Sequence, residues 1–232
     1  MHQTTAVPRR LWQIAGGLAL AHVVLIMAGI ALQSGPLFQD GAAGIQRGYV
    51  EGDLARTFTG GLIECVGFLL LIPVLVFLSR VLGRSSETGR WAAQTGLMCG
   101  IGYVAVTFAV GFPAGAAAMY GAQHGLDVDT AFAINNIRLF GYFLSLMLLG
   151  GQALAVAVTA LADHTAPRWL GVGGLVTGIA LLTAAPLASV GQQDWATLVW
   201  MVWFVGLAVV LLRHRPEESP GIAPERLSVR HA

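Results

Sequence analysis

Six long apolar segments constrain this chain more than any other feature of its sequence. A helix of about 20 mostly apolar residues crosses a hydrocarbon layer about 30 Å thick, so each segment is long enough to span a bilayer. Helices are expected because lipid cannot hydrogen-bond exposed backbone groups. The sequence therefore predicts an all-α, polytopic membrane helix bundle with six transmembrane helices. The predicted spans are 11–32, 60–82, 91–113, 138–161, 168–190 and 195–213.

The composition leaves no room for a separate soluble domain. Hydrophobic residues make up 56% of the 232 residues and charged residues only 11%, whereas a soluble protein carries roughly a quarter charged residues. The first apolar segment exceeds the roughly 7–15 residues of a signal-peptide core, which indicates an uncleaved span. We expect three regions: a cytoplasmic N-terminal tail at 1–10, a six-helix transmembrane domain at 11–213 and a disordered cytoplasmic tail at 214–232.

The placement of the arginines predicts the orientation of the bundle. All thirteen basic residues are arginine. With alternating spans, ten of them fall on one side and only Arg47, Arg56 and Arg138 on the other. The positive-inside rule then places both termini in the cytoplasm and the chain in the cell membrane as a multi-pass protein. A net charge of +1 and the lack of a basic stripe argue against a nucleic-acid partner. The lipid bilayer is the expected environment.

A polar stripe marks the fourth segment as the centre of the bundle. Arg138, Ser145, Gln152 and Thr159 recur at a spacing of seven residues. Seven residues are nearly two helical turns, so the four side chains share one face. Lipid cannot satisfy the hydrogen bonds of such a face. We therefore expect the other helices to gather around it.

Glu64 is the most informative single residue, because a carboxylate inside a span is costly and is usually paired or functional. Glu64 and Arg138 both fall in the outer third of the bundle, so we expect an ion pair between them. Two alternatives remain: a salt bridge that only locks helices, and a Glu64 side chain that reaches the outer headgroups. Other polar residues at similar depth or on the stripe extend the pocket. The predicted ligand-binding residues are Glu64, Arg138, Tyr142, Ser145, Asn135, His22 and Gln152.

The sequence predicts no cofactor and no metal. His22 stands near the bilayer midplane, but bis-histidine haem ligation needs a second histidine at membrane depth, and the others fall in loops, ends or tails. We interpret His22 as a hydrogen-bonded interior side chain that faces Gln152 or Tyr103. The chain has no His-Glu-x-x-His, Gly-x-Ser-x-Gly, Cys-x-x-Cys or phosphate-binding glycine loop. Cys65 and Cys99 are expected to stay free, because alternating spans separate them in depth.

An internal pattern is consistent with three repeated helical hairpins. Each odd-numbered span begins near an Arg and a Trp and carries a glycine five residues after the Trp. The tryptophans are Trp12, Trp91 and Trp169, and the glycines are Gly17, Gly96 and Gly174. Arg and Trp anchor helices at an interface, and small residues four apart let helix backbones approach closely. The alternative is that interfacial Trp and Gly are simply common in membrane proteins. In either case we expect Gly96 and Gly174 at helix–helix contacts.

Two short motifs carry a resemblance to a known class of families. Pro167-Arg168-Trp169-Leu170-Gly171 follows a helix of the Leu-Leu-Gly-Gly type, and Leu78-Ser79-Arg80-Val81-Leu82 closes the second span. The pattern resembles the uncharacterised six-helix integral-membrane families, classed as domains of unknown function, of bacteria with high-GC genomes. The likeness runs from about Arg56 to Pro186. The resemblance implies the six-helix fold and supplies no activity and no catalytic residue.

The leading functional hypothesis is a non-enzymatic membrane protein that binds or passes a small or lipid-like ligand through a polar pocket in its outer half. One alternative is a membrane-embedded enzyme in which Glu64 acts as acid or base and Arg138 or Tyr142 stabilises charge. Another is a structural subunit of a homo-oligomer or membrane complex, whose polar stripe meets a partner helix. An outward-open cavity around Glu64 would favour the first two hypotheses over the third.

Overall fold

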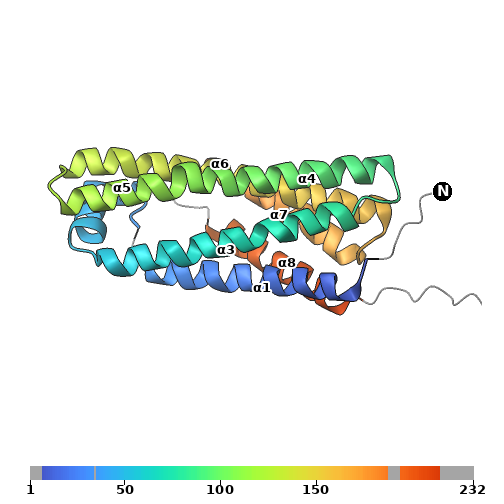
Figure 1. The fold of residues 1–232 in the computed structure, drawn as a ribbon. Coiled ribbons are helices and arrows are strands. Elements are labelled where there is room, and N and C mark those ends of the chain that lie inside the picture. Colours follow the sequence, from blue (N-terminus) through green and yellow to red (C-terminus); the bar gives the residue numbers. More distant parts are fainter. Residues whose placement is uncertain (1–6, 34, 188–193, 215–232) are drawn as a thin grey trace, which may run out of the picture.

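The computed structural model describes residues 7–33, 35–187 and 194–214. These residues form an elongated bundle whose long helices run roughly along one axis (Figure 1). Most of both predicted tails, 1–10 and 214–232, lies outside the described residues. The described part is helical without strands, so the predicted all-α fold is confirmed. The long helices are α1 (Arg9–Leu32), α3 (Leu54–Val81), α4 (Glu87–Val106), α5 (Phe112–Gln123), α6 (Val128–Asp163), α7 (Arg168–Leu187) and α8 (Asp194–Arg213).

Shorter elements complete the bundle. The π-helical turn η3 (Thr107–Gly111) joins α4 to α5 into one continuous span. Three short helices lie at the end of the bundle where α1 finishes and α3 begins, which we call the α2 end (Figure 1). They are η1 (Phe38–Asp40), α2 (Gly41–Ile45) and η2 (Gln46–Val50).

The helices have the length and surface of membrane spans. Six helices of the described residues, counting α4 to α5 as one, are long and apolar enough to cross a bilayer. Large apolar side chains point outward from several of them, with Leu62 of α3 at 68% exposed, Met98 of α4 at 70% and Val202 of α8 at 75%. Such exposure suits contact with lipid rather than with water. The six predicted spans are therefore confirmed by the length and apolar composition of the helices.

The boundaries of three elements differ from the sequence prediction. α3 begins at Leu54 rather than Gly60, because the side chain of Asp53 accepts a hydrogen bond from Arg56 N and caps the helix. The third span continues beyond residue 113 to Gln123, because Pro113 occupies the first turn of α5, where a missing N–H is tolerated. Much of the connection expected between the predicted spans 91–113 and 138–161 is helix, because α5 extends to Gln123 and Asp127 caps α6 through Thr130 N at 2.9 Å.

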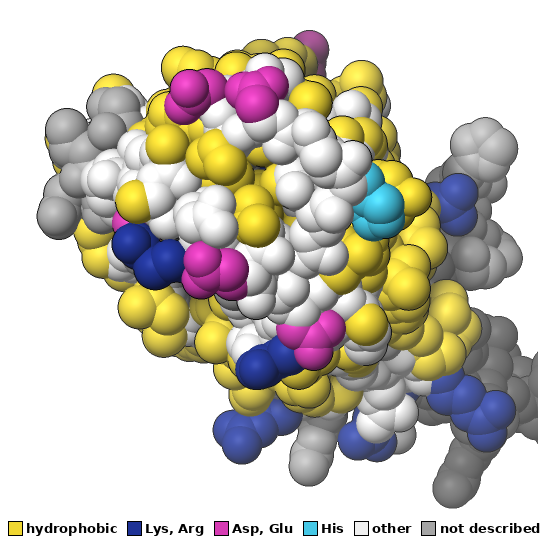
Figure 2. Space-filling view, turned by 90° about the vertical axis from the view of Figure 1, so that its left-hand side faces the viewer, with side chains coloured by type: hydrophobic (Ala, Val, Ile, Leu, Met, Phe, Trp, Pro, Cys, Tyr) yellow, Lys and Arg dark blue, Asp and Glu magenta, His cyan; other side chains and the backbone are white. Residues whose placement is uncertain are grey.

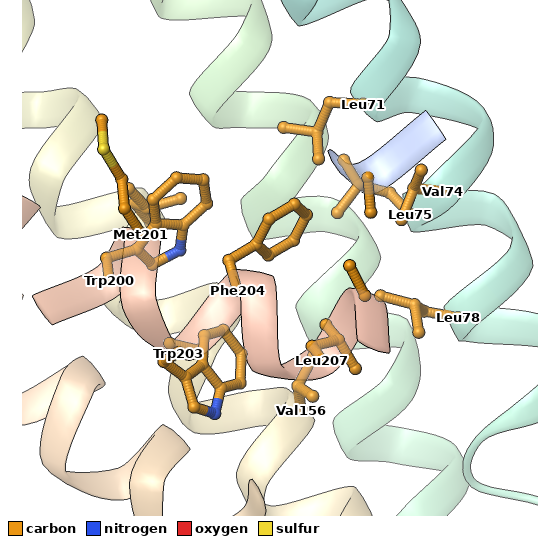
Figure 3. Packing of buried hydrophobic residues seen from close by; sticks show 14 of the residues in the cluster. Leu71, Val74, Leu75, Leu78, Val156, Trp200, Met201, Trp203, Phe204 and Leu207 are labelled. Atoms are coloured by element: carbon orange, nitrogen blue, oxygen red, sulfur yellow. The ribbon is translucent and has the colours of Figure 1, made fainter. Parts of the chain in front are cut away.

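α6 is the central helix, as the polar stripe predicted. It packs against α4, α5 and α7, and 61% of its apolar window is buried, the largest share among the six spans. Ser145, Gln152 and Thr159 of the stripe are all buried. A second seam joins α1 to α3 and α8. Figure 3 shows the α8 side chains of Trp200, Phe204 and Leu207 gathered with aliphatic side chains of α3 in one buried cluster.

The three predicted repeat glycines lie in different environments. A Cβ on Gly174 would come within 2.9 Å of Ala157 Cβ, and one on Gly96 within 3.2 Å of Ala155 Cβ, so both lie at tight contacts with α6. These two predictions are confirmed. Gly17 is different, because a Cβ there would meet nothing within 4 Å. In α1 the neighbouring Gly16 makes the close approach, to Leu212 of α8. The sequence pattern therefore does not correspond to a threefold repeat of packing.

The two ends of the bundle carry opposite charge. Seven of the described arginines lie at the end where α1 begins, and they are Arg9, Arg10, Arg80, Arg84, Arg90, Arg168 and Arg213. The α2 end carries acidic side chains over the short helices and the α5–α6 turn (Figure 2). Its acidic residues include Asp40, Glu51, Asp53, Asp127 and Asp129. The charge asymmetry expected from the sequence is therefore carried by two opposite ends of the folded chain.

Candidate functional site

A cavity of about 610 Å³ opens inside the half of the bundle nearest the α2 end. Its walls come from α1, α3, α5, α6 and α8, with further lining residues from the segment after α1, from η2, from α4 and from η3. This volume lies within the range of about 300–1,000 Å³ that is typical of small-molecule sites. The lining is mainly apolar and aromatic. Its large side chains include Phe58, Phe68, Phe112, Leu139, Trp200 and Met201.

Arg138 provides the positive charge of the cavity, and two hydrogen bonds hold its guanidinium in place. Its Nη2 donates to the Pro36 carbonyl oxygen at 2.7 Å, and its Nε donates to Asn135 Oδ1 at 2.9 Å. Asn135 is fully buried, accepts a second bond from the Tyr49 hydroxyl at 2.8 Å, and donates to the same Pro36 carbonyl at 3.2 Å. The network fixes the guanidinium between α6 and the segment that follows α1.

Two glycines make room for the Arg138 side chain. A Cβ on Gly115 of α5 would lie 2.8 Å from Arg138 Cδ, and one on Gly35 would lie 3.3 Å from both terminal guanidinium nitrogens. Both positions also line the cavity. Among the described residues, Nη1 has no hydrogen-bond partner. The guanidinium therefore keeps donors that are unused by the protein.

Glu64 provides the negative charge of the same cavity. Its Cγ packs over Gly29 of α1, where a side chain would collide with it. The Gln33 amide lies beside the carboxylate, but its nitrogen has no hydrogen bond of acceptable geometry. Arg138 lines the same cavity, yet no ion pair joins the two side chains among the described residues. The predicted ion pair between Glu64 and Arg138 is therefore wrong. The Arg138 guanidinium instead donates hydrogen bonds to Asn135 and to the Pro36 carbonyl oxygen.

Tyrosine and serine hydroxyls line the cavity between these charges. The Tyr142 hydroxyl hydrogen-bonds the Thr197 hydroxyl of α8 at 2.8 Å, and Ser145 Oγ donates to the Tyr142 carbonyl oxygen at 2.7 Å. Tyr103 of α4 lines the same cavity. Four predicted residues thus line one cavity: Glu64, Arg138, Tyr142 and Ser145. Asn135 supports it through Arg138.

His22 and Gln152 lie outside this cavity. His22 is fully buried, with Nδ1 at 2.8 Å from the Gly67 carbonyl oxygen and with Phe68, Trp200 and Phe204 around its ring. It was expected to face Gln152 or Tyr103, but it faces α3 and α8. Gln152 lies deeper on α6, beside a separate space of about 10 Å³. The cavity nevertheless reaches the His22 surroundings, because Phe68 and Trp200 line it.

Sequence reasoning missed Tyr49 as part of the site. Tyr49 lies in η2, is 3% exposed, and lines the cavity while orienting Asn135. Its partner lies 86 residues further along the chain, so no local pattern could indicate the contact. No group of three His, Cys, Asp or Glu side chains able to hold a metal occurs among the described residues. Cys65 and Cys99 are free thiols, as expected.

The helices and the charge pattern define a multi-pass, all-α membrane protein. The chain belongs to the family described as "Domain of unknown function (DUF4386)", whose sequence profile matches residues 14–214. The expected membership of an uncharacterised domain family is confirmed. No curated protein and no solved structure matches the chain.

Proposed function

We propose that this protein binds or passes a small, lipid-like ligand in its 610 Å³ cavity. One observation carries the proposal: Glu64 and Arg138 face the same largely apolar cavity without pairing to each other. A charge in a membrane-spanning helix is costly unless it has a partner or water. A bound ligand would supply partners for both charges and fill the apolar remainder.

The position of the lining residues supports a lipid-like ligand. Leu62 of α3 and Ile30 of α1 both line the cavity, and they are 68% and 49% exposed on the lipid-facing surface. The cavity wall is thus continuous with the surface that contacts acyl chains. A ligand dissolved in the bilayer would reach the cavity without crossing a charged end.

We place the cavity in the outer half of a bundle that lies in the cell membrane. The arginine-rich end, which also holds the first residue of α1 and the last of α8, would face the cytoplasm under the positive-inside rule. The α2 end, with its acidic residues, would then face outward. Ligand exchange would therefore take place with the outer leaflet.

An enzymatic role for Glu64 is the second candidate. The Glu64 carboxylate and the Tyr103 phenol line the same cavity, and Arg138 offers unused donors for developing negative charge. This role would require that the purified protein convert a bound lipid into a product detectable by mass spectrometry. Binding without conversion would favour the non-enzymatic role.

A cavity-filling variant tests the proposal. Gly61 lines the cavity, and a Cβ there would meet nothing within 4 Å. Gly61→Leu should therefore occupy the cavity without displacing a neighbour. Gly17→Leu is the matched control, because Gly17 is also helical, also meets nothing within 4 Å and lies away from the cavity.

The readout is the lipid that stays bound to the full-length protein in detergent, measured by native mass spectrometry. The proposal predicts retention by the wild type and by Gly17→Leu, and a loss of about tenfold or more in Gly61→Leu, since tenfold corresponds to only about 1.4 kcal/mol. Equal retention by both variants would show that lipid binds elsewhere. Absence of retained lipid from the wild type would overturn the proposed function itself.

A further inference from the structure

We propose that the cavity selects a zwitterionic amphiphile, whose anionic group binds Arg138, whose ammonium group binds Glu64 and whose apolar body fills the aromatic part. This inference rests on the proposed function and names its ligand class. The inference is based on one observation. A single cavity inside a membrane-spanning bundle holds one cationic and one carboxylate side chain that do not pair with each other.

Arg138 is organised to receive an anion. Its Nε and Nη2 bonds to Asn135 and Pro36 hold the guanidinium in one orientation. The acceptors in these bonds are neutral, so the positive charge is not cancelled. Guanidinium donors recognise phosphate and carboxylate oxygens with defined geometry. The unused Nη1 donors therefore suit an anionic group brought in by a ligand.

Glu64 is organised to receive a cation. Among the described residues its carboxylate has neither an ion pair nor a well-formed hydrogen bond, since the Gln33 amide beside it lacks suitable geometry. A carboxylate accepts hydrogen bonds only and takes up to four, so an ammonium group matches it. Phe68 and Tyr103 line the same cavity and are in mutual edge contact, with ring centroids 5.3 Å apart. Aromatic faces also attract ammonium groups.

The balance of charge distinguishes the possible head groups. The cavity holds one positive and one negative side chain, so its net charge is zero. An anionic ligand would satisfy Arg138 but would share the cavity with the Glu64 carboxylate, which repels it. A neutral ligand would leave both charges without a partner. A zwitterion supplies an opposite charge to each of the two side chains and places no like charges side by side.

The experiment compares lipids that share their acyl chains and differ only in head group. Purified full-length protein, stripped of co-purified lipid in detergent, is titrated with phosphatidylethanolamine, phosphatidylglycerol or diacylglycerol, and binding is followed by native mass spectrometry. The wild type should bind the zwitterionic lipid about tenfold or more tighter than either of the others, as expected for one added charge-assisted contact. Equal affinity for all three would overturn the inference while leaving the proposed function intact. No binding of any lipid would instead overturn the proposed function.

Glu64→Gln supplies the decisive variant, because it keeps the shape of the side chain and breaks no hydrogen bond within the described protein. It should bring the ratio of the two phospholipid affinities close to one. Glu51→Gln is the control, since Glu51 is exposed at the α2 end and its side chain accepts a hydrogen bond from Gln46; it should keep the wild-type ratio. A wild-type ratio in Glu64→Gln would show that Glu64 does not recognise the head group.

Soluble glycerophosphoethanolamine separates the two sources of the same chemistry. Because it is a phosphodiester, it carries the one negative and the one positive charge of the head group without the acyl chains, whereas a phosphate monoester would carry additional negative charge. As a competitor, it should displace bound phosphatidylethanolamine only at a concentration at least about a hundredfold higher, because burial of each CH₂ adds about 0.8 kcal/mol. Displacement at equal concentration would show that the site binds a free zwitterion, and it would overturn the inference that the ligand is an amphiphile.

Discussion

The Nη2 group of Arg138 donates a hydrogen bond to the carbonyl oxygen of Pro36 at 2.7 Å. This bond joins the central helix α6 to the segment that follows α1, two parts of the chain that are 102 residues apart. The Asn135 amide donates to the same carbonyl. The polar end of the cavity is therefore built from one carbonyl, one amide and one guanidinium rather than from an ion pair.

The Asn135 side chain should contribute more to stability than any other member of this network. Asn135→Leu leaves the Tyr49 hydroxyl and Arg138 Nε without an acceptor, and each unsatisfied buried group costs about 1–3 kcal/mol. Tyr49→Phe removes one donor and leaves Asn135 Oδ1 paired with Arg138, so its expected loss is only about 1 kcal/mol. Thermal unfolding in detergent should rank wild type, Tyr49→Phe and Asn135→Leu in order of falling Tm. Equal Tm values for the two variants would contradict the network.

Glu64→Gln should have little effect on stability. A broken buried ion pair typically costs about 3–5 kcal/mol, but Glu64 and Arg138 are not paired directly, so we expect a loss below about 1 kcal/mol. Arg138→Gln should be clearly more destabilising, because it removes the bonds to Pro36 and Asn135. The comparison is again of Tm in the same detergent. A large loss in Glu64→Gln that disappears in the double mutant would show that the two charges pair after all.

Part of this site could be predicted from the sequence. There is a physical reason why some of its residues could be predicted and others could not. A bilayer imposes an apolar length on each span, so the spans and the approximate depth of Glu64, Arg138, Tyr142 and Ser145 could be read locally. The rotation of a helix about its own axis depends on packing against its neighbours. For this reason the sequence placed His22 and Gln152 in the pocket, although neither lines it. The contact between Tyr49 and Asn135 depends on the path of residues 35–53, whose sequence carries no periodic signal.

Gly174 should tolerate substitution far less than Gly17. A side chain at Gly174 would meet Ala157 Cβ at 2.9 Å and the Ala153 carbonyl oxygen at 3.2 Å. Overpacking of this kind typically costs about 1–3 kcal/mol and can cost more. Gly174→Leu should therefore lower both Tm and the yield of monodisperse protein, while Gly17→Leu should leave both near wild type. Similar yields from the two variants would show that α6 and α7 are not packed this closely.

Reporter fusions should reveal the orientation of the bundle. The arginine-rich end is expected in the cytoplasm. A cytoplasmic reporter fused after Arg84, in the α3–α4 connection, should be active, and one fused after Gln46, at the opposite end, should be inactive. A periplasmic or external reporter should show the reverse pattern. Activity of an external reporter fused after Arg84 would show that the bundle has the opposite orientation, with the cavity in the inner leaflet.

A density map of the wild-type protein in a lipid nanodisc tests the central proposal most directly. An occupied site predicts continuous, elongated density within the cavity, with one end within hydrogen-bond distance of Arg138 Nη1 and a second contact at the Glu64 carboxylate. A map in which the cavity holds only separate water peaks, or is closed by its own side chains, would contradict a ligand-binding role for this pair of charges.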